Sequence, residues 1–242
     1  MNSVILFDLG NTIVNYHVGK ISDEEKEIIG LWNMLSTLKK FNVLVSFDVL
    51  FTQFYQPWLE VLPFRNQQKK EYDLKPFLSQ IIDLNRLTDD HYKELLIQFY
   101  EPFSRFAISP PGLQDTLTVL QEKGYKIGLV SNTPVPGFCH DLTLRNLNLF
   151  NYFDFRLYSY DVGIRKPNPE IFQKALTMSN CSSNNALMIG DSYELDIKIP
   201  IKLGFKTILF AGIKKQFGGN LGCKQFTACE DLIPAIDLIF NI

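Results

Sequence analysis

The sequence lacks an excess of charge of either sign, and this bounds the partners of the protein. Its 242 residues hold 24 Lys and Arg against 26 Asp and Glu, which gives a formal net charge of -2. Such a balance creates no overall field that would draw the chain to nucleic acid or to an anionic membrane. We therefore expect neither partner.

Long hydrophobic runs and paired cysteines are also missing. No apolar stretch could span a bilayer, and the first residues show neither a basic leader nor a small-residue cleavage site. We therefore expect a soluble, cytoplasmic protein. The cysteines are widely spaced, without the two-residue spacing of a zinc site, and are expected to be reduced packing residues. They are Cys139, Cys181, Cys223 and Cys229.

Short apolar runs, by contrast, recur along the chain and favour buried strands. Segments with helical spacing of apolar residues separate them. Strands that alternate with helices predict an α/β fold with a parallel, layered sheet. The runs cover residues 3–7, Lys126–Val130, Phe153–Leu157, Ala186–Ile189 and Lys206–Phe210.

The pattern changes between about residues 20 and 107, where aromatic-rich segments of helical period follow one another without a convincing strand. These segments are Glu24–Lys40, Phe47–Leu62, Lys75–Leu84 and Asp89–Tyr100. The insertion starts after the first strand and ends before a helix near Pro110, so we expect it to lie above the carboxyl ends of the strands as a lid. Its aromatic side chains, Trp58 among them, are expected to pack helices together rather than to bind substrate.

Polar side chains follow several of the apolar runs. Carboxyl ends of parallel strands meet at one edge of a sheet, where ligands bind in open α/β folds. The first run ends in Asp8, the second in Ser131-Asn132 and the fourth in Gly190-Asp191, with Asp196 five residues beyond and Lys166 between the third and fourth runs. We therefore expect these side chains to form one site.

The residue types at this edge suit phosphoryl transfer, which needs a nucleophile, cations and donors to the phosphate oxygens. Asp8 can attack phosphorus, and Asp191 with Asp196 can supply carboxylate oxygens to Mg²⁺. Lys166 and Ser131 can hold the phosphate. Each residue alone also has an ordinary structural explanation, such as a turn former or a helix-start acid. Their joint placement is what favours chemistry.

In this chain order the motifs resemble those of the haloacid dehalogenase-like (HAD) hydrolase superfamily. The segment Val4–Thr12 resembles the first motif, with Asp8 as nucleophile, and Ser131-Asn132 resembles the second. Lys166 before Pro167 resembles the third, and Gly190-Asp191 followed by Asp196 resembles the fourth. Four motifs in this order, spread over essentially the whole chain, make the resemblance specific.

The resemblance implies a Rossmann-like core, residues 1–17 and 108–242, with an inserted helical cap, residues 18–107. It also implies a magnesium-dependent phosphatase that acts on a small phosphorylated metabolite. Phosphate would be bound by Ser131, Asn132 and Lys166, and an aspartyl-phosphate would form on Asp8. The implied ligands of Mg²⁺ are Asp8, the carbonyl of Gly10, Asp191 and Asp196.

Gly10 departs from the family pattern. In the phosphatases of this family the residue two past the nucleophile is a second aspartate, which protonates the leaving group and then activates water. A positioned acid/base group contributes about 10²–10⁴ in rate, so release of alkyl alcohols should be slow without a substitute. His17, Asp23 and Glu24 are the nearest substitutes in sequence. Alternatively, the substrate has a good leaving group, such as an aryl or acyl phosphate.

Three other classes remain open. A 2-haloacid dehalogenase-like hydrolase also lacks an aspartate at the position of Gly10, but the retained acids Asp191 and Asp196 favour a magnesium site. A regulatory relative would bind metal and phosphate with little turnover. A phosphoacceptor receiver domain shares an aspartate, a hydroxyl residue and a Lys-Pro pair, but its metal-binding acids precede the acceptor and it has no large helical insertion.

Overall fold

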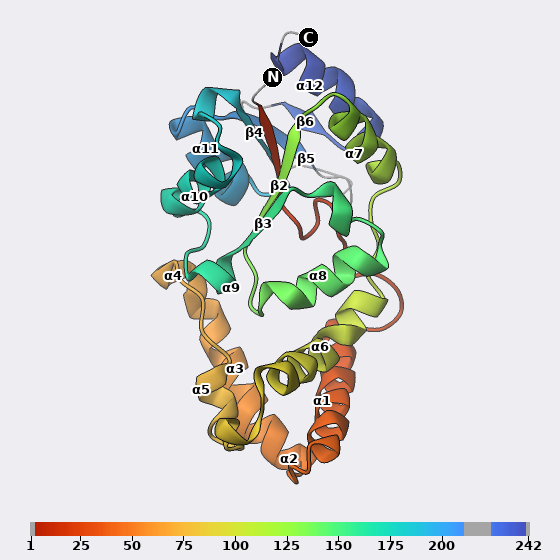
Figure 1. Ribbon diagram of the computed structural model, residues 1–242, viewed down its shortest axis with the longest axis vertical. Coiled ribbons are helices and arrows are strands. Elements are labelled where there is room, and N and C mark those ends of the chain that lie inside the picture. The colour runs from red at the N-terminus through yellow and green to blue at the C-terminus, as the bar shows by residue number, and fades with distance from the viewer. Residues whose placement is uncertain (1–2, 211–223, 241–242) are drawn as a thin grey trace.

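The computed structural model describes residues 3–210 and 224–240. A sheet and its covering helices form one end of the molecule, and the helices α1 to α6 form the other (Figure 1). The chain begins in the sheet, crosses to the helical end and returns. The helical end therefore faces the points where the strands finish.

Six strands form one parallel sheet with the order β3-β2-β1-β4-β5-β6. The five predicted strands are all present, which confirms the α/β fold. The two-residue strand β6 was not predicted, because two residues show no periodicity. The strands are β1 (Val4–Phe7), β2 (Lys126–Ser131), β3 (Phe155–Tyr158), β4 (Ala186–Gly190), β5 (Lys206–Phe210) and β6 (Gln225–Phe226).

The central strands β1 and β4 are apolar throughout because helices cover both faces of the sheet. In β1, Ile5 and Phe7 belong to one hydrophobic cluster, while Val4 and Leu6 belong to another. The first cluster includes residues of α7, α8 and α12, and the second includes residues of α10, with α11 packed against it. Successive side chains of a strand thus enter opposite cores.

The helices of the sheet end follow the strands in the alternation that the sequence predicts, and the helix expected near Pro110 is α7. They are α7 (Leu113–Glu122), α8 (Gly137–Asn146), α9 (Ser159–Val162), α10 (Pro169–Ser179), α11 (Lys198–Lys202) and α12 (Leu232–Phe240). A π-helical turn, Tyr193–Ile197, precedes α11.

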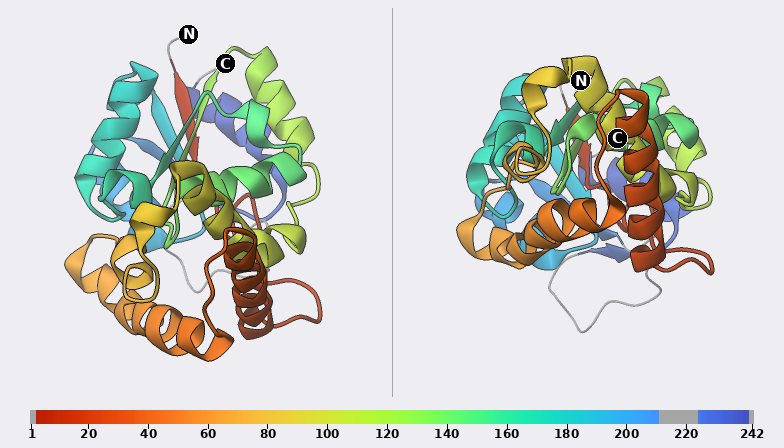
Figure 2. Two further views of the ribbon diagram at one scale, coloured as in Figure 1. Left: turned by 60° about the horizontal axis from the view of Figure 1, so that its bottom comes forward. Right: turned by 90° about the horizontal axis from the view of Figure 1, so that it is seen from below.

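Helices alone connect β1 to β2, as predicted. They are α1 (Asp23–Lys40), α2 (Phe47–Val49), α3 (Gln56–Val61), α4 (Arg65–Gln68), α5 (Lys75–Leu78) and α6 (Asp89–Arg105), followed by α7. The expected helix Phe47–Leu62 is interrupted by the π-helical turn Leu50–Tyr55, and the expected helix Lys75–Leu84 ends early at Leu78. Figure 2 shows the α1 to α6 helices grouped beside the sheet end of the molecule.

The start of α1 has a strong local cause. The Ser22 hydroxyl accepts a hydrogen bond from the Glu25 amide, and the Glu25 carboxylate accepts one from the Ser22 amide. This capping box, with Asp23 and Glu24 in the first turn, stabilises the helix N-terminus. It fixes Asp23 at the first residue of the helix.

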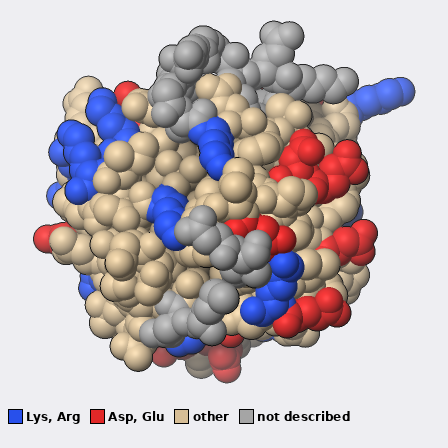
Figure 3. Space-filling model, turned by 90° about the horizontal axis from the view of Figure 1, so that it is seen from above, with Lys and Arg blue, Asp and Glu red and all other residues tan. Residues whose placement is uncertain are grey.

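The surface carries charged side chains of both signs. On the face seen in Figure 3, basic and acidic side chains form separate small groups among other residues. Among the described residues, no helix is long and apolar enough to cross a membrane. Cys139 and Cys229 are buried free thiols, as predicted, and Cys181 is partly buried; Cys223 lies outside the described residues.

Candidate active site

The side chain of Asp8 lies at the carboxyl end of β1 and is almost fully buried. Its Oδ1 accepts a hydrogen bond from Lys166 Nζ at 2.6 Å, and its Oδ2 accepts one from Thr12 Oγ1 at 3.2 Å. The Asp8 amide donates to the carbonyl of Ile189, which extends the pairing of β1 with β4 by one residue. The sheet itself thus sets the position of this carboxylate.

Lys166 joins two of the predicted site residues. Its Nζ lies 2.6 Å from Oδ1 of Asp196 as well as from Asp8, and the lysine side chain is only 1% exposed. A buried ammonium ion is stable only where carboxylates surround it. The predicted lysine therefore does lie in the predicted site.

Asn132 holds the backbone of Lys166 in place. Its Oδ1 accepts from the Lys166 amide at 2.8 Å, and its Nδ2 donates to the Lys166 carbonyl at 2.9 Å. Both polar atoms of the Asn132 side-chain amide thus bind the backbone of Lys166. This contact gives Asn132 a positioning role that the sequence did not reveal, and its predicted contact with substrate stays a prediction.

Asp196 sits in the π-helical turn after β4 and packs against Gly190. Its Oδ2 accepts a hydrogen bond from the Ser192 amide at 3.0 Å. A β-carbon built on Gly190 would lie 2.4 Å from the Asp196 side chain, so only glycine fits there. The glycine of the Gly190-Asp191 motif is thus explained by the space that the Asp196 side chain needs.

Carboxylate oxygens of Asp8, Asp191 and Asp196 lie within 4.8 Å of one another. Such hard oxygen donors are the ligands that Mg²⁺ prefers. The Lys166 ammonium pairs with two of these carboxylates, those of Asp8 and Asp196. The residues present therefore fit a magnesium ion.

Burial and charge oppose each other in this cluster. Burial alone would lower the pKa of Lys166, but Asp196 and Asp8 outweigh it and hold this pKa above its usual value. Burial also raises the pKa of Asp196, Lys166 works against this, and the negative charge of Asp8 adds to it. The pKa values of Lys166 and Asp196 are both raised because each buried side chain lies beside a negatively charged carboxylate.

A cavity of about 290 Å³ lies between the strand ends and the helices of the insertion. Gly10, Ser131 and Asn132 line it from the sheet side, while Trp58 and Phe99 line it from α3 and α6. Ser131 is nearly buried at the end of β2. The cavity brings two of the predicted phosphate-binding residues, Ser131 and Asn132, together with an aromatic wall, whereas Lys166 is not among the residues that line it.

Trp58 was expected only to pack helices, and the structure adds a second role. It is 4% exposed and packs against Phe99 with ring centroids 6.0 Å apart, yet it also lines the cavity. Its indole Nε1 has no hydrogen-bond partner among the described residues. Other predicted packing aromatics, Trp32 and Phe64, are instead about half exposed.

A histidine and two tyrosines form part of the cavity wall. Nδ1 of His140 lies 3.1 Å from the hydroxyl oxygens of both Tyr16 and Tyr100. Burial lowers the pKa of His140 to about 3, so this imidazole is neutral near neutral pH. Burial also raises the pKa of both tyrosines. The wall is thus polar but uncharged here.

The predicted acid/base candidates differ in whether they line the cavity. His17 and Asp23 line it together with Glu27, which sequence reasoning missed, and the side chain of His17 is 58% exposed. Glu24 is exposed and is not among the lining residues. Glu27 lies one helical turn after Asp23 on α1, and that spacing is the signal that could have identified it.

Buried ion pairs tie the insertion to the loop that carries Lys166. The Arg165 guanidinium donates to Glu71 Oε1 and to Asn66 Oδ1, each at 2.9 Å. Glu71 also accepts from the hydroxyl of Ser159 at 2.6 Å and pairs with Arg65. The segment around Glu71 is therefore fixed directly beside the active-site lysine.

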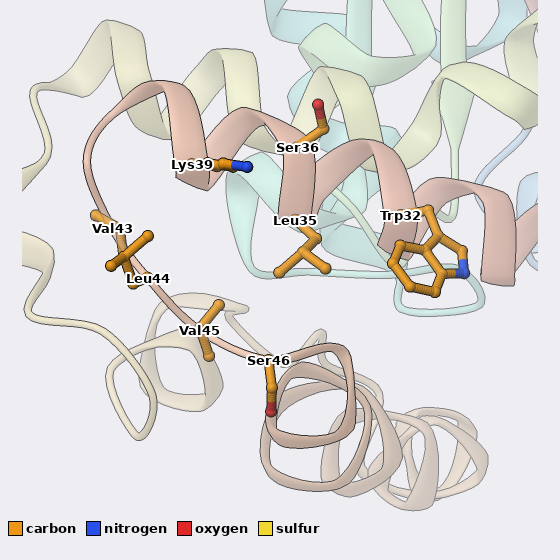
Figure 4. A pocket seen from close by; sticks show the side chains of 8 residues that line it. All are labelled: Trp32, Leu35, Ser36, Lys39, Val43, Leu44, Val45 and Ser46. Atoms are coloured by element: carbon orange, nitrogen blue, oxygen red, sulfur yellow. The ribbon is translucent and has the colours of Figure 1, made fainter.

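A larger hollow of about 570 Å³ lies elsewhere, between α1 and the segment 43–46 (Figure 4). Trp32 and Leu35 project into this region from α1, and Val43 and Val45 lie on the connecting segment. None of the predicted site residues lines it. The cavity beside Gly10 and Ser131 is therefore the candidate active site.

The parallel sheet gathers carboxylates and an ammonium at its strand ends, the edge where ligands bind in open α/β folds. The family model for haloacid dehalogenase-like hydrolases matches residues 3–204. The chain therefore belongs to the haloacid dehalogenase-like hydrolase family, and it is a hydrolase. The predicted family membership is confirmed.

Related proteins bear out the same class. The chain is 27% identical over 213 residues to the glyceraldehyde 3-phosphate phosphatase of Pyrococcus furiosus, covering 86% of this chain and 80% of the relative. This similarity supports the predicted assignment to the phosphoric monoester hydrolases.

Solved structures share the fold. The HAD phosphatase from Thermococcus onnurineus superposes with a TM-score of 0.61 at 22% identity, covering 97% of both chains. The 2-haloacid dehalogenase from Pseudomonas syringae pv. Tomato DC3000 gives the same TM-score at 19% identity, covering 98% of this chain and 99% of the other. The fold alone thus does not separate phosphatase from dehalogenase.

Proposed function

We propose that the protein is a magnesium-dependent phosphatase that hydrolyses a small phosphorylated metabolite through an aspartyl-phosphate on Asp8. The observation that carries this proposal is the environment of Asp8. Its carboxylate contacts Lys166 and lies close to Asp191 and Asp196, and the residues that follow it, Leu9 and Gly10, line a cavity together with Ser131.

In the proposed reaction the Asp8 carboxylate attacks phosphorus and the bond to the leaving oxygen breaks. Lys166 and the hydroxyl of Ser131 hold the phosphate oxygens, and Asn132 keeps Lys166 in position through its backbone. Water then attacks phosphorus and releases Asp8 and inorganic phosphate. Thr12 steadies the second oxygen of Asp8 throughout.

Mg²⁺ would be held by Asp8, the Gly10 carbonyl, Asp191 and Asp196, and it would reduce the repulsion between the anionic nucleophile and the anionic phosphate. The support for this ligand set is the convergence of three carboxylates around one another. Asp196 also pairs with Lys166, so it holds the lysine whether or not it binds the metal directly.

We further propose that residues 18–107 act as a cap on a core formed by residues 1–17 and 108–242. Support comes from the cavity, whose aromatic wall belongs to helices of this segment. Support also comes from Glu71, which ties the segment to Arg165 beside Lys166. A cap of this kind would keep water from the attacking carboxylate.

Two other functions are separable by assay. A dehalogenase attacks carbon and does not need Mg²⁺, whereas the three clustered carboxylates of this protein favour a metal-dependent reaction. A regulatory relative would bind phosphate with little turnover, and Gly10 is the residue that favours it. Both differ from the proposal in measurable ways.

The decisive assay measures hydrolysis of aryl, acyl, sugar and nucleotide phosphates with Mg²⁺ and with a chelator, alongside a 2-haloacid. We expect turnover of phosphate esters that the chelator abolishes and that Asp8→Asn reduces by a factor of 10³ or more, on the order of the loss of a catalytic nucleophile. Asp48→Asn, at an aspartate in the first turn of α2, is the control. Metal-independent activity retained by Asp8→Asn would overturn the proposal.

A further inference from the structure

The space beside Gly10 raises the question of which group handles the proton. A β-carbon built on Gly10 meets no atom within 4 Å, so packing does not require glycine there. Glycine itself has no side chain that could donate a proton. A proton donor for the leaving group must therefore come from farther along the wall of the cavity.

Three titratable groups of that wall are poorly suited to this role. The imidazole of His140 is neutral and turned to two tyrosine hydroxyls through Nδ1. Tyr16 and Tyr100 are fully buried, and burial raises the pKa of each. These groups do not exchange protons readily near neutral pH. His17, Asp23 and Glu27 remain.

His17 and Asp23 form an oriented pair. Nδ1 of His17 lies 2.5 Å from Oδ2 of Asp23, and because a carboxylate only accepts, Nδ1 carries the proton. The His17 amide also donates to Asn15 Oδ1 at 2.9 Å, which fixes the backbone at this point. Nε2 is then the ring nitrogen that is left to give or take a proton.

Asp23 is itself held in place. Lys26 Nζ donates to Asp23 Oδ1 at 3.1 Å and to the Tyr16 carbonyl at 2.6 Å, and Lys26 is fully buried. Burial would raise the pKa of Asp23, but the hydrogen bonds from Lys26 and His17 outweigh it and lower this pKa. Asp23 is therefore a fixed anion, suited to orient an imidazole.

We propose that His17, oriented by Asp23, supplies the proton transfers that an aspartate at position 10 would otherwise perform. The inference rests on the proposed phosphatase function. Three observations carry it: the open space at Gly10, the His17 to Asp23 hydrogen bond, and the cavity that His17 shares with Gly10 and Ser131. His17 is the catalytic residue in this scheme, and Asp23 is a positioning residue.

His17 transfers a proton in each of the two chemical steps. Asp8 attacks phosphorus, the bond between phosphorus and the leaving oxygen breaks, and that oxygen takes the Nε2 proton of the His17 imidazolium. The alcohol departs and His17 is neutral. Water then attacks the phosphorus of the aspartyl-phosphate, and the bond between phosphorus and the Asp8 oxygen breaks, which releases the Asp8 carboxylate and free phosphate. The proton that water loses goes to Nε2 and restores the imidazolium.

Glu27 is the competing donor in the same wall. Its carboxylate accepts a hydrogen bond from the Tyr55 hydroxyl, and burial raises its pKa, with the negative charges of Asp23 and Glu24 adding to the effect. We assign it to the cavity wall instead, because its known partner is a tyrosine of the π-helical turn and no described contact links it to the loop after Asp8.

The test compares His17→Asn, Asp23→Asn, Glu27→Gln and, as the exposed control, Glu24→Gln in the full chain with Mg²⁺. A 4-nitrophenyl phosphate and an alkyl phosphate serve as substrates, because only the alkyl leaving group needs protonation. We expect His17→Asn to slow the first turnover of the alkyl ester by about 10²–10⁴. Its first turnover of the aryl ester should stay within a few fold of the parent.

The second step gives an independent readout. Because water activation also passes through His17, phosphorylated Asp8 should accumulate in His17→Asn with the aryl ester. Added imidazole should restore turnover in His17→Ala, and Gly10→Asp introduced into His17→Asn should restore hydrolysis of the alkyl ester. Asp23→Asn should show the same selectivity with a smaller loss, and Glu24→Gln should match the parent.

Two results would overturn this inference while leaving the phosphatase proposal intact. One is an alkyl-selective loss in Glu27→Gln and not in His17→Asn, and the other is equal losses for aryl and alkyl esters in His17→Asn. A parent enzyme that never forms phosphorylated Asp8 from either ester would instead overturn the proposed function. The two failures are therefore distinguishable.

Discussion

The Lys166 ammonium lies 2.6 Å from the Asp8 carboxylate in a site where both side chains are buried. The lysine thereby joins two carboxylates, since Asp196 lies at the same distance on its other side. Lys166 is therefore expected to contribute both to the stability of the fold and to the chemistry of the site.

Lys166→Met should destabilise the fold as well as abolish activity. Without the ammonium, Asp8 and Asp196 are buried carboxylates without their counter-ion, and breaking such a pair costs about 3–5 kcal/mol. Denaturant unfolding in the presence of a chelator measures the change. Lys198→Met is the control, because Lys198 is exposed and pairs with Glu194 along one helix face; its midpoint should stay near that of the parent.

Gly190→Ala and Gly10→Ala should behave differently although both add one methyl group. At Gly190 the new carbon would lie 2.4 Å from Asp196, whereas at Gly10 it would meet nothing within 4 Å. Overpacking of this kind costs about 1–3 kcal/mol. Thermal unfolding should therefore show a loss for Gly190→Ala alone, and equal stabilities of the two variants would contradict the packing described for Asp196.

Asn132→Ala should reduce kcat because it frees the backbone of Lys166. Both hydrogen bonds between the Asn132 amide and that backbone are lost, and a displacement of about 1 Å at a reacting centre can cost about 10² in rate. Asn146→Ala is the matched control, since it removes a single hydrogen bond to Ser104 between α8 and α6. The control should lose stability but retain kcat; the reverse pattern would refute the positioning role of Asn132.

Acid should destabilise the protein through His140. Its pKa in the folded protein is about 3, below the ordinary value of about 6.5 for histidine. The unfolded chain then binds a proton that the folded protein does not. The free energy of unfolding therefore falls as the pH drops from about 6.5 towards 3, by up to about 1.4 kcal/mol per pH unit.

His140→Gln should remove this part of the pH dependence, because glutamine does not titrate but still accepts a hydrogen bond from Tyr16 or Tyr100. The measurement is the free energy of unfolding by denaturant at several pH values between about 4 and 7 for parent and variant. The free energies of unfolding of parent and variant should approach each other as the pH falls. If the two instead changed in parallel with pH, His140 would be protonated in the folded protein just as it is in the unfolded chain.

The sequence predicted the parts of this structure that depend on local pattern. Strand β1 and the position of Asp8 follow from one apolar run. The placement of the reactive side chains at one sheet edge follows from the parallel strands. Each of these signals involves neighbouring residues or a rule of sheet topology.

The parts that were missed depend on contacts between distant segments. The clamp of Asn132 on Lys166 joins residues 34 apart, and the role of Glu27 depends on how α1 meets the strand ends. The interruption of the helix Phe47–Leu62 by a π-helical turn leaves the apolar period nearly unchanged, so periodicity could not reveal it. The magnesium ligands, the cap boundaries and the phosphate contacts stay predictions.

The most direct test of the central claim is a single turnover in heavy-oxygen water with enzyme in excess over an aryl phosphate, followed by mass analysis of phosphate and of the peptide that contains Asp8. The account predicts a phosphorylated Asp8 during the turnover and heavy oxygen in the released phosphate, because water attacks phosphorus. Heavy oxygen in the phosphate with no phosphorylated Asp8 at any time, or heavy oxygen in the Asp8 carboxylate, would contradict it.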